Sequence, residues 1–101
     1  MLVPQTELIT IAAAGTPVQC TLTEPACAIY AYNPHATDKV YVGLAGLTKA
    51  TGVKVIQEIL AGAHFHPDLV GDGRNLINPR DYWFDAAGNG QTIEVTVWGH
   101  V

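Results

Sequence analysis

Short runs of alternating apolar and polar residues recur along the chain, and turn residues separate them. The clearest run is residues 91–98, where Ile93, Val95 and Val97 alternate with threonine and glutamate. Because successive side chains of a strand point to opposite faces, this alternation predicts a strand with one buried face. Shorter runs at 8–12, 18–23, 27–32, 39–44 and 81–84 also predict strands, and residues 86–90 predict a turn.

The segment 53–75 is less regular. Its apolar positions fit a helical stripe as well as an extended one, and they are Val53, Val55, Ile56, Ile59 and Leu60. The β-branched residues and the glycines at both ends favour a strand. Residues 64–69 predict another strand, which Pro67 would confine to a sheet edge or a bulge, and residues 71–75 predict a loop.

These seven or eight short strands predict an all-β protein, a single β-sandwich of jelly-roll or immunoglobulin-like type. The chain has 101 residues, which fits one domain over residues 1–101. Its apolar, proline-bearing start makes residues 1–6 a candidate N-terminal arm. The connectivity of the strands stays open.

The composition narrows the range of partners. Charged residues make up 14% of the chain, against roughly 25% in ordinary domains, while 49% of residues are apolar. We therefore expect neighbouring subunits to cover part of the surface. The net charge is −4 and the five lysines and arginines are scattered, so we expect no nucleic-acid partner and no membrane partner. The start carries no basic segment followed by an apolar stretch, so we expect synthesis in the cytoplasm without a signal peptide.

Two histidines are the candidate metal ligands. His64 and His66 are two residues apart, so on a strand both imidazoles would face the same side and could contact one metal ion, with Asp68 as an oxygen ligand. In a trimer, one histidine per subunit on the symmetry axis would do the same. His-x-His alone is weak evidence, and two surface imidazoles beside a loop are the commoner arrangement. We expect no cofactor.

Cys20 and Cys27 flank a turn at 23–25. In a hairpin the two thiols could lie opposite one another and form a cross-strand disulfide. Buried, unpaired cysteines are common, and the chain carries no secretory signal. We therefore favour two core thiols, with the disulfide as the alternative.

No catalytic set emerges from the sequence, and we expect the protein not to be an enzyme. Serine is absent, which removes the commonest hydrolase nucleophile. The acids at positions 68, 72, 81 and 85 are expected to be solvated loop residues rather than a glycosidase pair. The tyrosines and tryptophans differ in parity from strand to strand, so the sequence predicts core packing and subunit contacts rather than one aromatic face.

Several short motifs resemble those of small virion proteins of tailed bacteriophages. They are residues 27–34 (CAIYAYNP), 40–43 (VYVG), 51–52 (TG), 60–62 (LAG), 81–91 (DYWFDAAGNGQ) and 95–98 (VTVW). The resemblance covers most of the chain from Cys27 onward, although the stretch 64–79 is longer than the family pattern. It implies a non-enzymatic head decoration (cement) protein on the capsid surface of the virion. Such a protein would bind the major capsid protein, bridge its subunits and assemble as a homotrimer.

Two other functions are weighed against this one. The first is a tail- or fibre-associated module that binds a host-surface carbohydrate, which an exposed coplanar aromatic pair on one sheet would favour. The second is a metal-dependent cupin-like enzyme using His64 and His66. A cupin needs further histidine and glutamate ligands at set spacings, and these are not found.

Overall fold

The computed structural model describes residues 2–22, 26–67 and 77–100. Within them lie eight strands and one 3-10 turn, η1 (Pro79–Asp81). The strands are β1 (Leu2–Ile11), β2 (Val18–Gln19), β3 (Ala28–Tyr32), β4 (Val40–Thr48), β5 (Val53–Ile59), β6 (His64–Phe65), β7 (Trp83–Ala86) and β8 (Gln91–His100). None of these residues forms a helix long and apolar enough to cross a membrane.

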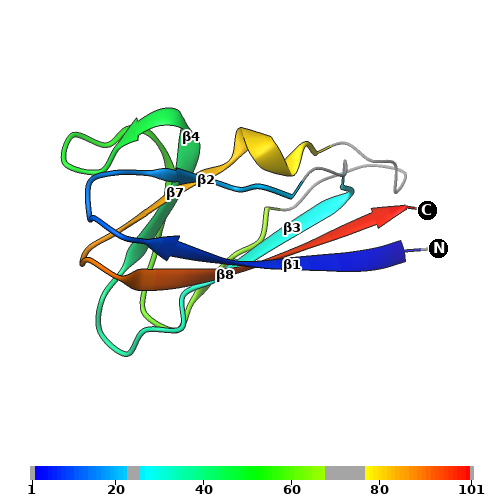
Figure 1. Cartoon of the computed structure of the whole chain (residues 1–101), viewed down its shortest axis with the longest axis horizontal. Coiled ribbons are helices and arrows are strands. Elements are labelled where there is room, and N and C mark those ends of the chain that lie inside the picture. The colour runs from blue at the N-terminus through cyan, green and yellow to red at the C-terminus, as the bar shows by residue number, and fades with distance from the viewer. Residues whose placement is uncertain (1, 23–25, 68–76, 101) are drawn as a thin grey trace.

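The strands form two four-stranded antiparallel sheets that pack against each other, which confirms the predicted all-β sandwich (Figure 1). Sheet A has the order β1-β8-β3-β6, and sheet B has the order β2-β7-β4-β5. The first strand thus neighbours the last, the second neighbours the seventh, and so on inward to β4 and β5. This order is that of a jelly roll. An immunoglobulin-like sandwich would instead place its first two strands side by side in one sheet.

The core lies between the sheets and consists of the inward residues of the alternating runs. Sheet A supplies Ile9, Ile11, Ile29, Ala31, Phe65, Ile93, Val95 and Val97. Sheet B supplies Val40, Val42, Ile59, Phe84 and Ala86. Full burial of one such aliphatic or aromatic side chain contributes roughly 1.5–3 kcal/mol. The alternation in β3 and β8 therefore fixes which of their side chains remain outside, and these form the face described below.

The N-terminal segment differs from expectation. We expected residues 1–6 as a candidate arm, but residues 2–6 form the first half of β1. They pair with the end of β8 in unbroken register, from Leu2 opposite His100 to Thr6 opposite Thr96. The reason is the length of β8, whose backbone N–H and C=O groups would otherwise lack partners along that edge.

The structure also gives the bounds of four other predicted strands. The strand over 53–59 is confirmed as β5, and β6 lies at the edge of sheet A just before Pro67. In the described part of the run 18–23, Val18 and Gln19 form β2, while Cys20 is buried and Leu22 packs on the core. β7 begins two residues later than predicted because Asn78 starts η1, where its side chain accepts a hydrogen bond from the backbone N–H of Arg80. Residues 68–75 lie outside the described residues.

The chain itself covers part of the outer face of sheet B, over β4 and β7. The β4–β5 hairpin, drawn in green in Figure 1, folds back so that Leu47 lies over Gly43. A Cβ at Gly43 would come within 2.2 Å of the Lys54 carbonyl oxygen and 3.0 Å of the Leu47 Cβ. From the other side, the backbone N–H of Gly15 donates to the Asp85 carboxylate at 3.0 Å. Asp85 is therefore 1% exposed, although it was expected to be a solvated loop acid.

Candidate functional site

The outer face of sheet A carries the molecule's candidate site. The alternation that buries Ile29 and Ala31 turns Tyr30 and Tyr32 outward on β3. In β8 it likewise turns Glu94, Thr96 and Trp98 outward. The strand register places Tyr30 opposite Thr96, Tyr32 opposite Glu94, and Ala28 opposite Trp98. These side chains therefore form two adjacent rows on one surface, which we call the aromatic face.

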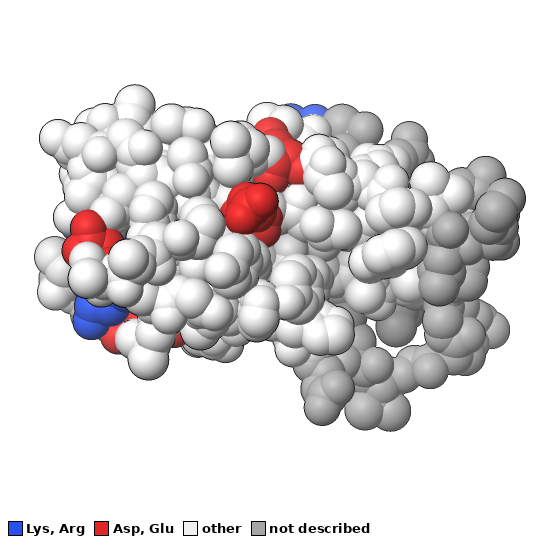
Figure 2. Space-filling model, turned by 90° about the horizontal axis from the view of Figure 1, so that it is seen from below, with Lys and Arg blue, Asp and Glu red and all other residues white. Residues whose placement is uncertain are grey.

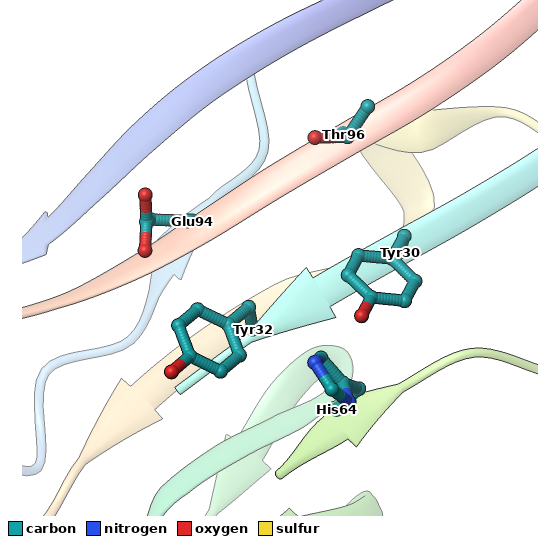
Figure 3. Close-up of a pocket in the computed structure, with 5 residues that line it drawn as sticks. All are labelled: Tyr30, Tyr32, His64, Glu94 and Thr96. Carbon is teal, nitrogen blue, oxygen red and sulfur yellow. The ribbon is translucent and has the colours of Figure 1, made fainter. Parts of the chain in front are cut away.

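His64 of β6 and His66, which follows β6, complete the aromatic face along its edge. Tyr32 pairs with His64, and the ring centroids of these two residues lie 5.0 Å apart at 31°. The centroid of Tyr30 lies 4.7 Å from that of His64 and 5.6 Å from that of His66. Figure 3 shows the two tyrosine rings broadside to the viewer, lying along the sheet rather than standing on edge. Both tyrosines are partly exposed, and their rings lie along the outer surface of the sheet.

Two shallow depressions lie side by side on this face. The first has a volume of about 280 Å³ and is lined by Tyr30, Tyr32, His64, Glu94 and Thr96 (Figure 3). The second has a volume of about 330 Å³ and is lined by Ala28, Tyr30, His66, Thr96 and Trp98. Tyr30 and Thr96 belong to both, so the depressions are continuous. Trp98 is 41% exposed, so a large part of its indole ring is open to solvent.

The electrostatics of the aromatic face are simple. Among the residues that line the two depressions, Glu94 is the only aspartate, glutamate, lysine or arginine. Two of the described lysines are engaged elsewhere: Lys39 pairs with Glu58 of β5 at 3.1 Å, and Lys49 donates to the Ala86 carbonyl oxygen at 2.9 Å. Figure 2 likewise shows a surface of mostly uncharged residues with only a few acidic and basic side chains. An anionic ligand would find no counter-charge among the residues lining the depressions.

The structure brings the two predicted metal ligands to the same side. The rings of His64 and His66 both lie next to Tyr30, as expected for two residues that are two positions apart and face the same side. Within the described parts of the chain, no three side chains of His, Cys, Asp or Glu are placed to hold a metal ion together. Asp68, the third ligand of the hypothesis, lies outside the described residues. The contacts that the structure shows for the two imidazoles are with the ring of Tyr30, and for His64 also with that of Tyr32.

The two cysteines are unpaired thiols whose backbones bond to different sheets. The backbone N–H of Cys20 donates to Tyr82 beside sheet B, while that of Cys27 donates to Trp98 of sheet A. The hairpin required for the alternative disulfide is therefore wrong. Cys20 is a core thiol as expected, and burial raises its pKa to about 11. Cys27 is only half-buried, and its thiol donates to the Trp98 carbonyl oxygen at 3.2 Å.

The aromatic face is the feature that sequence reasoning missed. We expected differing parities to prevent a shared aromatic surface, but Tyr30, Tyr32 and Trp98 all point outward from sheet A. A signal was available: Tyr30 and Tyr32 alternate with Ile29 and Ala31, and Trp98 shares the parity of Thr96. What the sequence lacked was the pairing of β3 with β8, which joins segments some 66 residues apart. No protein-family model, curated protein or solved structure matches this chain, so its own geometry is the basis for interpreting the face.

Proposed function

We propose that this protein is a non-enzymatic virion structural protein, a capsid decoration (cement) protein on the outer surface of the head. In this role it binds the major capsid protein and bridges neighbouring subunits. The motif resemblance of residues 27–98 supports the proposal. The jelly-roll order of the strands agrees with it by analogy, since capsid domains use the same architecture, although the fold alone does not define a function.

The observation that carries the proposal is the apolar edge of sheet B. This name denotes four large, exposed apolar side chains in β4, in β5 and directly after β5: Leu44, Val53, Ile56 and Leu60, which are 46%, 53%, 47% and 62% exposed. Val53 and Ile56 belong to β5, the edge strand of its sheet. An edge strand with exposed apolar residues favours association with another protein surface. We assign the capsid protein as the occupant of this apolar edge.

Copy number in the particle tests the location. Quantitative mass spectrometry of purified virions is expected to find hundreds of copies of the protein per particle, all removable without opening the head. A handful of copies would contradict decoration and favour a tail or fibre position. Light scattering of the isolated protein is expected to give the mass of a trimer, and a strict monomer would contradict the homotrimer.

A matched pair of variants tests the apolar edge. Ile56→Glu places a charge on the edge, and it is expected to weaken binding to undecorated heads at least about tenfold. Leu8→Glu is the control, because Leu8 is 61% exposed on sheet A, away from that edge. Equal binding by both variants would contradict the assigned surface.

One specific observation favours a second candidate function, the carbohydrate-binding module. It is the pair Tyr30 and Tyr32, whose rings lie flat on one open sheet face (Figure 3). Exposed, flat aromatic pairs suit stacking against sugar rings. Because this face and the apolar edge belong to different sheets, one protein can carry both functions.

A further inference from the structure

We propose that the aromatic face binds a neutral oligosaccharide of at least two pyranose rings. This inference deepens the carbohydrate-binding candidate and rests on it, but it is independent of the proposed place on the capsid. It assigns one ring to each of the two depressions, with Tyr30 shared between them. The chemistry of the lining residues and the shape of the surface carry the argument.

The first step is stacking. One face of many pyranose rings carries mainly C–H groups, which are apolar and pack against aromatic rings, while the hydroxyls lie around the rim. Tyr30 and Tyr32 present their flat sides along the sheet, as such packing requires (Figure 3). Trp98 offers an open indole surface at the second depression. Aromatic residues whose rings stay open to water at a concave surface are typical of ligand sites.

The second step is hydrogen bonding around the ring. The first depression adds the carboxylate of Glu94, an acceptor of two hydroxyls, and the hydroxyl of Thr96, a donor and an acceptor. Hydrogen bonds from a sugar hydroxyl to a carboxylate are charge-assisted and therefore strong. His64 lies beside the tyrosines at the rim and offers ring nitrogens. An apolar platform flanked by a few polar groups is the composition that a sugar needs.

The third step is charge, which selects among ligand classes. Glu94 disfavours sialylated, phosphorylated or sulfated glycans and nucleic acid, because among the described residues no lysine or arginine lines either depression. A protein partner is the competing occupant. A protein fits less well because the carboxylate of Glu94 lines the first depression opposite Tyr32, and charged residues are depleted at the centre of protein interfaces. The neutral oligosaccharide is therefore the occupant we assign.

The fourth step is length. The depressions measure about 280 and 330 Å³, near the lower end of the roughly 300–1,000 Å³ typical of small-molecule sites. Each depression therefore has room for about one sugar ring. The glycosidic bond between the two rings would lie over Tyr30 and Thr96, which line both depressions. We expect a disaccharide to bind at least about tenfold more tightly than its monosaccharide, because the second ring adds contacts to Trp98.

Titration of ¹⁵N-labelled protein by NMR tests the assignment. The probes are cellobiose, N,N′-diacetylchitobiose, lactose and the corresponding trisaccharides, with 3′-sialyllactose as the anionic counterpart. At least one neutral probe is expected to shift the amide signals of β3 and β8 at millimolar concentration. Tyr32→Ala and Glu94→Gln are expected to weaken its binding about tenfold or more. Thr48→Ala, a change at an exposed residue of β4 on sheet B, is the control and is expected to leave binding unchanged.

Two results would overturn the inference. One is the absence of shifts with every neutral probe at 20-fold molar excess and millimolar concentration, while the variants keep the wild-type fold. The other is release of the protein from heads by Tyr32→Ala, which would make the aromatic face a protein contact. Neither result bears on the apolar edge, since Ile56→Glu tests the capsid proposal separately. Conversely, normal capsid binding by Tyr32→Ala together with lost sugar binding would support both proposals.

Discussion

The outer faces of the two sheets are built in opposite ways. On sheet B the chain covers the part of the face over β4 and β7: Leu47 lies over Gly43, and the loop at Gly15 holds the carboxylate of Asp85. Tyr41 is only 8% exposed, and the Lys49 ammonium lies over its ring. On sheet A, Tyr30 and Tyr32 stay partly exposed and line the depressions of the aromatic face. Residues of the same chemical type are thus buried on one sheet and left open on the other.

This difference separates residues that stabilise the fold from residues that are available to a partner. The cover of sheet B consists of close contacts and hydrogen bonds, so its residues should contribute to the free energy of unfolding. The aromatic face contributes less to folding because much of its apolar surface stays in water. Large apolar side chains held open in this way usually mark an interaction surface. Variants of the two faces should therefore change different measurements.

The largest effect is expected from opening the cover of sheet B. Gly43→Ala would place a Cβ 2.2 Å from the Lys54 carbonyl oxygen, so backbone of the β4–β5 hairpin must move. Such overpacking should lower the free energy of unfolding by about 3 kcal/mol, measured by urea denaturation. Gly88→Ala is the matched control, because there the nearest atoms belong to the flexible side chain of Gln91 at 3.3 Å. Equal loss of stability in both variants would contradict the tight cover.

A somewhat smaller effect is expected at Asp85. Its Oδ1 accepts hydrogen bonds from the backbone N–H groups of Gly15 and Ala86, at 3.0 and 2.8 Å. Asp85→Ala leaves both donors without this acceptor and should cost about 2 kcal/mol of stability. Asp85→Asn keeps Oδ1, and Oδ2 has no hydrogen-bond partner among the residues described here. The asparagine variant should therefore be at least as stable as wild type in thermal unfolding, and a loss equal to that of alanine would contradict this account.

The two cysteines differ in burial, because Cys20 lies in the core and Cys27 is partly exposed. Burial raises the pKa of Cys20 from 9.0 to about 11, so its protonated thiol is favoured in the folded state. The corresponding stability is fully present below pH 9 and is lost as the pH rises through about 11. We expect a decline of roughly 2 kcal/mol or less over this window.

The measurement is urea unfolding of wild type and Cys20→Ala at several values between pH 8 and 11. The variant should lose less stability than wild type across this window, although burial also raises the pKa of Tyr82 and adds a decline of the same sign to both. Thiol labelling at pH 8 gives a second readout. Half-buried Cys27 should react in the folded protein and Cys20 should not, whereas equal rates would contradict the difference in burial.

The strands that could be predicted were those with a local pattern of alternating or β-branched residues. Residues 91–98 alternate cleanly and became β8, and the β-branched run at 53–59 became β5. The predicted run 27–32 also ends where β3 ends, at Tyr32. The role of the next residue was not predictable: Asn33 is buried, and its side-chain amide donates to the carbonyl oxygens of Asp38 and Ile59. A side chain that joins segments distant in the chain leaves no local pattern.

The candidate site was predictable only in part, for the same reason. His64 and His66 were singled out, and they do lie on one side, but their neighbour Tyr30 comes from a strand more than thirty residues earlier. The burial of Asp85 also depends on a distant residue, Gly15. Parity within a strand is a local property, whereas the face that a parity selects depends on which strands pair. The strand order was the missing information in each case.

The smallest expected change in stability belongs to the aromatic face, and it bears most directly on the contrast between the sheets. Tyr32 is half-exposed and its partners are the cross-strand neighbours Glu94 and His64. Tyr32→Ala should therefore lower the free energy of unfolding by no more than about 1 kcal/mol, the usual size of a cross-strand pair. The same variant should weaken binding of a neutral disaccharide about tenfold or more. A loss of stability as large as that of Gly43→Ala would mean that the tyrosine holds the sandwich together, and the aromatic face would then be part of the structure rather than a surface kept open for a ligand.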